Sequence, residues 1–419
     1  MNTAQTRPSP IKPDERIIAV DLLRGVAVLG ILIMNIQSFA MIQAAYFNPT
    51  AYGDLSGINR WVWIVSHVLG EQKFLSIFSI LFGAGILLMT GRLEMQGQRP
   101  AGSHYRRMAW LLVIGLCHGY LLWYGDILVS YAMLGSVAYL FRRLRPRTLL
   151  ITGLAIIAVS SALSLLGGWS IQFWDAKALE QNRQWWAPGA EAVARELAAF
   201  RGGWLEQMSE RVRATVFFQT VGFFFFTSWR AGGLMLVGIA LMKWGVLSGE
   251  RSARWYRWLL VIGFGLGIPV VSYGVVANFE VGWTLEYSWM LGSQYNYWGS
   301  LAIAGGIIGA VMLLHRSGVL TPLREALSAT GRMAFSNYLL QTLICTTLFY
   351  GHGLGLFGSV ERWGQLLMVV GLWIVALIVS PLWLGRFRYG PVEWLWRSLT
   401  YWSLQPMRRG EDAREGLHR

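Results

Sequence analysis

Two residues with catalytic potential, His118 and Asp126, lie in the apolar stretch GLCHGYLLWYGDIL. His118 falls about halfway through an apolar run long enough to cross a membrane. A neutral imidazole at that depth can act as a general base or a proton relay, or it can simply hydrogen-bond between helices. Asp126 follows at a tight turn, where it either caps the next helix or lines the mouth of a cavity. Both are catalytic candidates, although eight residues of continuous helix would separate them by ~12 Å.

A second polar group lies on the first apolar run, IIAVDLLRGVAVLGILIMNIQ. At about 100° per residue, Asp21, Arg24 and Asn35 share one stripe of a helix. Ionisable groups in a membrane helix cost several kcal/mol unless they face a bundle interior or reach the interface. We therefore expect this helix to be central, with the three residues as substrate-binding candidates. Asp21 and Arg24 form an intrahelical ion pair, or Arg24 binds an anionic ligand such as a phosphate or a thioester donor.

A third group lies in GRMAFSNYLLQT, which places Asn337, Tyr338 and Gln341 on one helical face. The two amides are candidates for positioning a substrate, and interhelical hydrogen bonding is the alternative use of such groups. Two further residues, His67 and Glu71, have i, i+4 spacing, but a metal site needs a third ligand that the sequence does not supply. We expect no metal. The chain also lacks the P-loop, GxSxG and HExxH signatures.

The composition places these residues in a membrane protein. Hydrophobic residues make up 54% of the 419 residues, 22 are Trp, and the mean hydropathy is +0.43. The apolar runs are near-continuous and ~20 residues long, which favours helices over a β-barrel. The net charge of +14 reflects basic loops between apolar runs, as the positive-inside rule describes, so we expect no nucleic-acid partner. Cys117 and Cys345 both fall in apolar runs, which argues against a disulfide framework.

The fold class expected is an all-α polytopic membrane protein with ten spans and one larger external loop subdomain, with the lipid bilayer as partner. The predicted spans are 17–37, 74–89, 108–124, 127–141, 149–166, 231–246, 258–276, 297–314, 333–350 and 364–384. The sequence from 217 to 226 is ambiguous between an external segment, a re-entrant one and part of the sixth span. Most Lys and Arg residues then fall inside, with both termini cytoplasmic.

These spans divide the chain into five regions. They are a cytoplasmic tail at 1–16, a five-helix half at 17–166, an external amphipathic segment at 167–230, a second five-helix half at 231–385 and a basic cytoplasmic tail at 386–419.

Five sequence blocks carry a family resemblance. In chain order they are DLLRGVAVLGILIMNI, IFSILFGAG, GLCHGYLLWYGDILVSYAMLG, GRMAFSNYLLQT and GPVEWLWRSLTYWSLQPMRR. Together they resemble the bacterial inner-membrane family called domain of unknown function 418, or YeiB-like, over nearly the whole chain. The resemblance implies a multi-pass protein of the bacterial inner membrane.

The DLLRG block is also similar, more distantly, to the first helix of transmembrane acyltransferases. Those enzymes move acyl groups from cytoplasmic donors to acceptors across the membrane. In the acyltransferase-3 group an Arg is followed eleven positions later by a His thought to be catalytic. Arg24 matches that Arg, but the eleventh position here is Asn35. An amide cannot serve as a general base near neutral pH, so the acyltransferase hypothesis requires His118 in that role.

The leading hypothesis is a membrane acyltransferase that uses acetyl-CoA or another acyl-CoA and acts on an envelope, glycan or small-molecule acceptor. Arg24 would bind the donor phosphates, His118 would be the base, and Asn35, Asn337 and Gln341 would position substrate. Two alternatives remain open. One is a transporter or channel for a small solute, and the other is a non-catalytic membrane scaffold.

Overall fold

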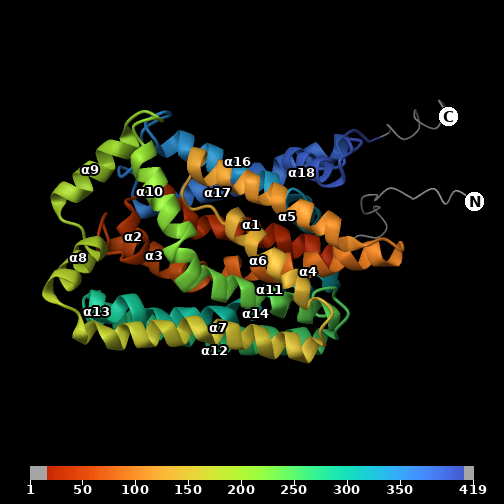
Figure 1. The fold of residues 1–419 in the computed structure, drawn as a ribbon, viewed down its shortest axis with the longest axis horizontal. Coiled ribbons are helices and arrows are strands. Elements are labelled where there is room, and N and C mark those ends of the chain that lie inside the picture. The colour runs from red at the N-terminus through yellow and green to blue at the C-terminus, as the bar shows by residue number, and fades with distance from the viewer. Residues whose placement is uncertain (1–16, 410–419) are drawn as a thin grey trace, which may run out of the picture.

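The computed structural model describes residues 17–409, and this part of the chain is helical almost throughout (Figure 1). Its one β-type pairing is an isolated bridge between Phe387 and Arg408. Apolar runs of this length become helices because a helix satisfies its backbone hydrogen bonds within one segment. The helical fold class is therefore confirmed. The predicted tail at 1–16 and residues 410–419 of the C-terminal tail lie outside the described residues.

Helix α1 (Ile18–Ala40) lies at the centre of the bundle (Figure 1). It packs against α4 (Lys73–Met95), α15 (Thr321–Arg332), α16 (Ala334–Phe349) and α17 (Arg362–Arg386). Most of its residues are buried, Asp21 included. The prediction that the first helix is central is confirmed.

The remaining long helices surround this centre. Figure 1 shows α7 and α12 along one edge of the bundle and α5 and α16 on the opposite side of α1. Their bounds are α5 (Pro100–Cys117), η2 (His118–Leu122), α6 (Leu128–Phe141), α7 (Pro146–Ser170), α11 (Ser228–Lys243), α12 (Ala253–Glu280) and α14 (Ser293–Ser317). The amphipathic helix α18 (Pro391–Tyr401) packs against α5 and α16.

Short helices cover one end of the bundle, at the left of Figure 1. They are α2 (Gln43–Phe47), α3 (Gly57–Leu69), η3 (Ile171–Phe173), α8 (Ala176–Trp186), α9 (Ala190–Arg201), α10 (Met208–Gln219), α13 (Leu285–Tyr287) and η5 (Ser288–Gly292). After α10, η4 (Phe223–Thr227) leads into α11 and lies against the middle of α7. Aromatic side chains hold this end together, for example Phe200 stacked on Phe357. We call it the capped end.

Seven helical stretches in residues 17–409 are long and apolar enough to cross a membrane. They are Ile18–Ala40, Gly57–Met95, Pro146–Phe173, Met208–Lys243, Ala253–Glu280, Leu285–Ser317 and Arg362–Arg386. The protein is therefore a helical membrane protein. The residues of the ambiguous segment 217–226 lie within the fourth stretch, which runs through α10, η4 and α11.

Three predicted spans, 108–124, 127–141 and 333–350, are not among these stretches. Helix α6 has 14 residues and α16 has 16, so they extend ~21 and ~24 Å against a hydrocarbon core of ~30 Å. Helix α5 carries His104, Arg106 and Arg107 in its first half, which lowers its hydropathy. The count of ten spans is thus not confirmed.

Candidate active site

His118 lies where the third predicted span stops being an α-helix. Helix α5 ends at Cys117, one turn of π-helix covers His118–Leu122, and Trp123 is extended. The chain then turns back through Gly125. A side chain at Gly125 would collide with the Trp123 ring, because a Cβ there would lie 2.3 Å from a ring atom. The turn brings the chain back beside His118, so the ~12 Å separation expected for a continuous helix does not apply.

The result is a buried pair. His118 Nδ1 lies 2.8 Å from Asp126 Oδ1, and each side chain is 1% exposed. Asp126 Oδ2 accepts a hydrogen bond of 2.9 Å from the backbone N–H of Val129 and so caps α6. On the other side, His118 Nε2 lies 3.0 Å from the hydroxyl of Thr342 on α16. Asp126 thus both caps a helix and contacts the histidine.

This order of groups, hydroxyl then imidazole then carboxylate, is a known catalytic arrangement. A carboxylate beside Nδ1 favours the tautomer with its proton on that nitrogen. Nε2 then carries a lone pair directed at a hydroxyl. The arrangement can remove a proton from an alcohol placed where the Thr342 hydroxyl now lies.

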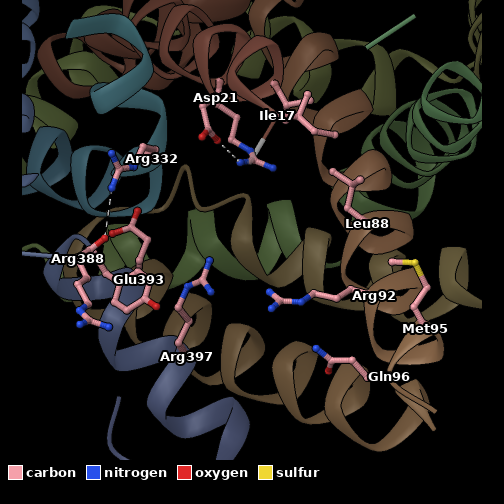
Figure 2. A pocket seen from close by; sticks show the side chains of 13 residues that line it. Ile17, Asp21, Leu88, Arg92, Met95, Gln96, Arg332, Arg388, Glu393 and Arg397 are labelled. Carbon is pink, nitrogen blue, oxygen red and sulfur yellow. Dashed lines mark hydrogen bonds and ion pairs between the residues drawn. The ribbon is translucent and has the colours of Figure 1, made fainter. Parts of the chain in front are cut away.

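A cavity of about 430 Å³ opens at the end of the bundle opposite the capped end. Figure 2 shows Arg92 and Arg397 extending into one space from opposite sides, with Asp21 above them. Five arginines line it, namely Arg24, Arg92, Arg332, Arg388 and Arg397, against two acids, Asp21 and Glu393. We call it the arginine cavity.

Close packing of α1 on α15 brings two of these arginines together. A Cβ at Gly25 would lie 2.0 Å from the carbonyl of Leu327, and one at Gly331 would lie 1.8 Å from the carbonyl of Asp21. Only glycine fits these contacts between two backbones. Arg24 and Arg332, each next to one of these glycines in the chain, both line the cavity as a result.

The two acids are engaged by other groups. Arg24 Nη1 donates to Asp21 Oδ1 over 2.9 Å, so the ion pair, one of the two expected roles of Arg24, is present. Glu393 accepts hydrogen bonds from the backbone N–H of Phe335 at 2.7 Å and from the hydroxyl of Ser336. The Glu393 carboxylate thereby caps the start of α16. Burial raises the pKa of Glu393, and these hydrogen bonds oppose the shift. The lining remains strongly positive, which suits an anionic ligand.

A second cavity, of about 230 Å³, shares Arg24, Arg92, Arg332 and Arg397 with the first. Its inner part is apolar, with walls that include Val28, Ile31, Phe78, Phe82, Leu111 and Leu128. It reaches Ile127, which follows Asp126, and Tyr338, whose ring centroid lies 5.2 Å from that of His118. We call it the apolar cavity. It adjoins the arginine cavity through the shared residues and extends to Ile127 and Tyr338, the neighbours of the His118–Asp126 pair, while neither member of the pair lines it.

None of the three predicted substrate-binding amides lines the arginine cavity or the apolar cavity. Asn35 is half-buried on α1 and lines neither cavity, and its side chain hydrogen-bonds to no other described residue. Asn337 donates to the Thr330 carbonyl and the Ser380 hydroxyl, each at 3.1 Å. Gln341 donates to the Val28 carbonyl at 3.4 Å. Asn337 and Gln341 therefore connect α16 to neighbouring helices.

In the remaining polar pair, His67 Nδ1 contacts the Glu71 carboxylate just before the start of α4. Residues 17–409 contain no group of three or more His, Cys, Asp or Glu side chains arranged to hold a metal.

Sequence reasoning did not identify Thr342 or four of the five arginines. Thr342 follows Gln341 directly in the block GRMAFSNYLLQT, but nothing in one sequence marks it as the partner of His118. Arg92, Arg332, Arg388 and Arg397 fall in segments that the positive-inside rule already explains. Their convergence depends on the fold alone.

Two curated relatives match nearly the whole chain. The "Uncharacterized protein YeiB" of Escherichia coli (strain K12) is 35% identical over 398 residues, which cover 94% of this chain and 98% of the relative. The "Uncharacterized protein YxaH" of Bacillus subtilis (strain 168) is 33% identical, with 95% and 97% covered. This chain belongs to the YeiB-like DUF418 family.

The family profile, described as "Protein of unknown function (DUF418)", matches residues 241–403 of this DUF418 protein. That range includes Arg332, Thr342, Arg388 and Arg397 but neither His118 nor Arg24. A third relative, the "Uncharacterized 39.9 kDa protein in amylase 3'region" of Bacillus acidopullulyticus, is 25% identical over 94% of this chain and 96% of its own length. No solved structure matches the chain. The family resemblance expected from the five sequence blocks is confirmed.

Proposed function

We propose that this DUF418 protein is a membrane acyltransferase that moves an acyl group from a cytoplasmic acyl-CoA to a hydroxyl of an envelope, glycan or small-molecule acceptor. The observation that carries the proposal is the continuity of the two cavities. An arginine-lined entrance leads into an apolar space that ends at Tyr338, beside His118.

The donor fits the cavities by its chemistry. Acyl-CoA carries phosphate groups at one end and a thioester with an acyl chain at the other. The phosphates would pair with Arg24 and the other arginines, since guanidinium groups bind phosphate in a bidentate manner. The acyl end would enter the apolar cavity, where burial is favourable by roughly 25 cal/mol per Å² of apolar surface.

The chemical step would use the His118–Asp126 pair. The acceptor hydroxyl would take the place of the Thr342 hydroxyl beside Nε2. Nε2 removes its proton as the acceptor oxygen forms a bond to the thioester carbonyl carbon. The carbon–sulfur bond then breaks, and the proton passes from the imidazolium to the leaving thiolate. Asp126 holds the imidazole in the required tautomer and stabilises its charged form.

We assign indirect roles to the amides. Asn337 and Gln341 hold α16 against its neighbours and thereby fix Tyr338 and Thr342. Asn35 faces no cavity in this structure, so a role in substrate positioning requires a conformational change on binding.

We further propose ten crossings of the bacterial inner membrane, with both termini and the arginine cavity cytoplasmic. Helices α5, α6 and α16 are shorter or more polar than ordinary spans, but each packs within the bundle. Helix α5 gains length from η2. The external segment 167–230, between the two membrane halves 17–166 and 231–385, would then lie with the capped end outside.

The test is native mass spectrometry of the protein in nanodiscs, before and after addition of acetyl-CoA. We expect bound coenzyme A or an acetyl adduct, lost in Arg24→Ala and kept in Arg254→Ala, since Arg254 is exposed at the start of α12. Co-purification of a small solute without any binding of acetyl-CoA or coenzyme A would contradict the proposal and favour transport.

A further inference from the structure

A buried arginine at the capped end leaves hydrogen-bond donors unused. Arg211 on α10 is 0% exposed. Its Nη2 donates to the Trp204 carbonyl at 3.1 Å and to the Met208 sulfur at 3.0 Å. Its Nε and Nη1 have no hydrogen-bond partner among residues 17–409. A buried donor without an acceptor destabilises the folded protein by ~1–3 kcal/mol, and a charged donor by more. A bound ligand that accepts these hydrogen bonds would remove that cost.

Another buried arginine shows how the fold satisfies such a group when its role is structural. Arg230 on α11 donates from Nη1 to the Tyr297 carbonyl at 2.7 Å. Its Nη2 donates to the hydroxyls of Ser76 at 3.0 Å and Ser300 at 2.7 Å. Three protein acceptors surround that guanidinium. The Arg211 guanidinium has one carbonyl acceptor and one weak thioether acceptor, both at Nη2.

No protein carboxylate neutralises Arg211 within the described residues. Glu210, the adjacent acid, pairs with Arg213 at 3.4 Å instead. Tyr350 lies close enough for an electrostatic interaction with Arg211, and its hydroxyl is also fully buried and without a partner. Two guanidinium nitrogens, which carry three N–H groups between them, and one O–H group are therefore available beside a positive charge. That set of donors matches an oxyanion.

The site has a route to the surface at the capped end. The Trp204 ring stacks on Arg211, and the guanidinium carbon lies 5.0 Å from the ring centroid. Trp204 itself is 37% exposed. His352 is exposed and interacts electrostatically with Arg211. Movement of these two side chains would admit a ligand from that end.

We propose that Arg211 and Tyr350 form a binding site for an oxyanion, a carboxylate or a phosphate, that enters from the capped end of the bundle. The site goes beyond the proposed function, since binding there requires no acyl transfer. It also lies one turn of α10 from Thr215, whose hydroxyl donates to the Gly119 carbonyl at 2.9 Å, next to His118. An acceptor anchored by an anionic group at Arg211 would extend toward the histidine.

The test measures local protection. In a protein with Cys117→Ser, Cys345→Ala and His352→Cys, an impermeant maleimide labels position 352. Sodium phosphate and sodium acetate are each compared with sodium chloride at equal ionic strength. We expect at least one oxyanion to slow labelling about fivefold or more, and the comparison identifies phosphate or carboxylate as the preferred group. The readout is independent of acyl-CoA binding, so its failure is distinguishable from failure of the proposed function.

Variants assign the effect to the site. Arg211→Gln should abolish the protection, and Arg213→Gln, two residues further along α10 and exposed, should retain it. Tyr350→Phe preserves packing and charge but removes one donor, so it should weaken the protection. This variant still tests the site if Arg211→Gln does not fold. Equal protection in Arg211→Gln, or none from either anion because only water fills the site, would overturn the proposal.

Discussion

His118 Nδ1 and Asp126 Oδ1 lie 2.8 Å apart in a region closed to solvent. The contact exists because the chain leaves the α-helix at His118 and reverses at Gly125. It converts two separate candidates into one unit. An isolated buried histidine is a weak base, whereas one held by a carboxylate has a defined tautomer and a stabilised charged form.

The first prediction concerns this pair. Asp126→Asn should lower kcat for acyl transfer by about 10²- to 10⁴-fold, because the amide favours the wrong tautomer of His118. His118→Ala should remove the activity. Thr342→Val should retain activity within about tenfold, since the acceptor hydroxyl displaces Thr342. Complete loss in Thr342→Val, with an acyl adduct on Thr342 in the wild type, would instead make Thr342 a nucleophile.

The second prediction concerns the arginine cavity. Arg332→Gln should raise the Kd for acyl-CoA about tenfold or more, because it removes a charge-assisted contact to phosphate. The wild-type Kd should also rise with salt concentration. Isothermal titration calorimetry in nanodiscs measures both, with Arg254→Gln as the exposed control on the same side. An unchanged Kd in Arg332→Gln would place the donor elsewhere.

The third prediction concerns the contact between α1 and α15. Gly331→Ala should destabilise the protein by about 1–3 kcal/mol, because the new Cβ would meet the Asp21 backbone carbonyl, which cannot move aside. Gly91→Ala in α4 has no atom within 4 Å of its new Cβ and should be neutral or slightly stabilising. Thermal unfolding of the two variants in detergent provides the comparison. Similar melting temperatures would show that the two helices can separate at no cost.

The fourth prediction concerns pH. Burial raises the pKa of Glu196 on α9 from 4.5 to about 7, and the hydrogen bond from the Gln43 N–H at 2.8 Å opposes the shift. The folded protein therefore binds this proton more tightly than the unfolded chain. Glu196 contributes stability that is complete below pH 4.5 and is lost as pH rises through about 7.

Hydrogen exchange of α9 between pH 5 and pH 8, corrected for the intrinsic rate, should consequently show weaker protection at the higher pH. Glu196→Gln should remove this dependence. A slope that persists in Glu196→Gln would assign the effect to another group.

The fifth prediction concerns topology. A single cysteine at Ala190, which is exposed at the start of α9, should react with an impermeant thiol reagent added outside intact cells. A cysteine at Ser252, exposed before α12, should react only after permeabilisation. Both belong in a background without Cys117 and Cys345. Labelling of position 190 only from the cytoplasmic side would reverse the proposed orientation.

The sequence by itself determined the class of the protein. Long apolar runs must become helices in a bilayer, since no other single segment satisfies its own backbone. The same reasoning identified a central first helix, because Asp21 and Arg24 are too costly to face lipid. The sequence blocks also identified the family, and His118, Asp126 and Arg24 were each recognised as unusual within apolar surroundings.

Only the tertiary structure decided which of these groups meet. The His118–Asp126 contact depends on a π-helical turn and a reversal that no hydrophobic period encodes, and Thr342 reaches His118 from a helix more than 200 positions away in the chain. The arginine cavity is assembled from distant segments through the contact at Gly331. Periodicity specifies which face of a helix is polar, whereas the contacts between helices depend on packing that the whole chain determines together.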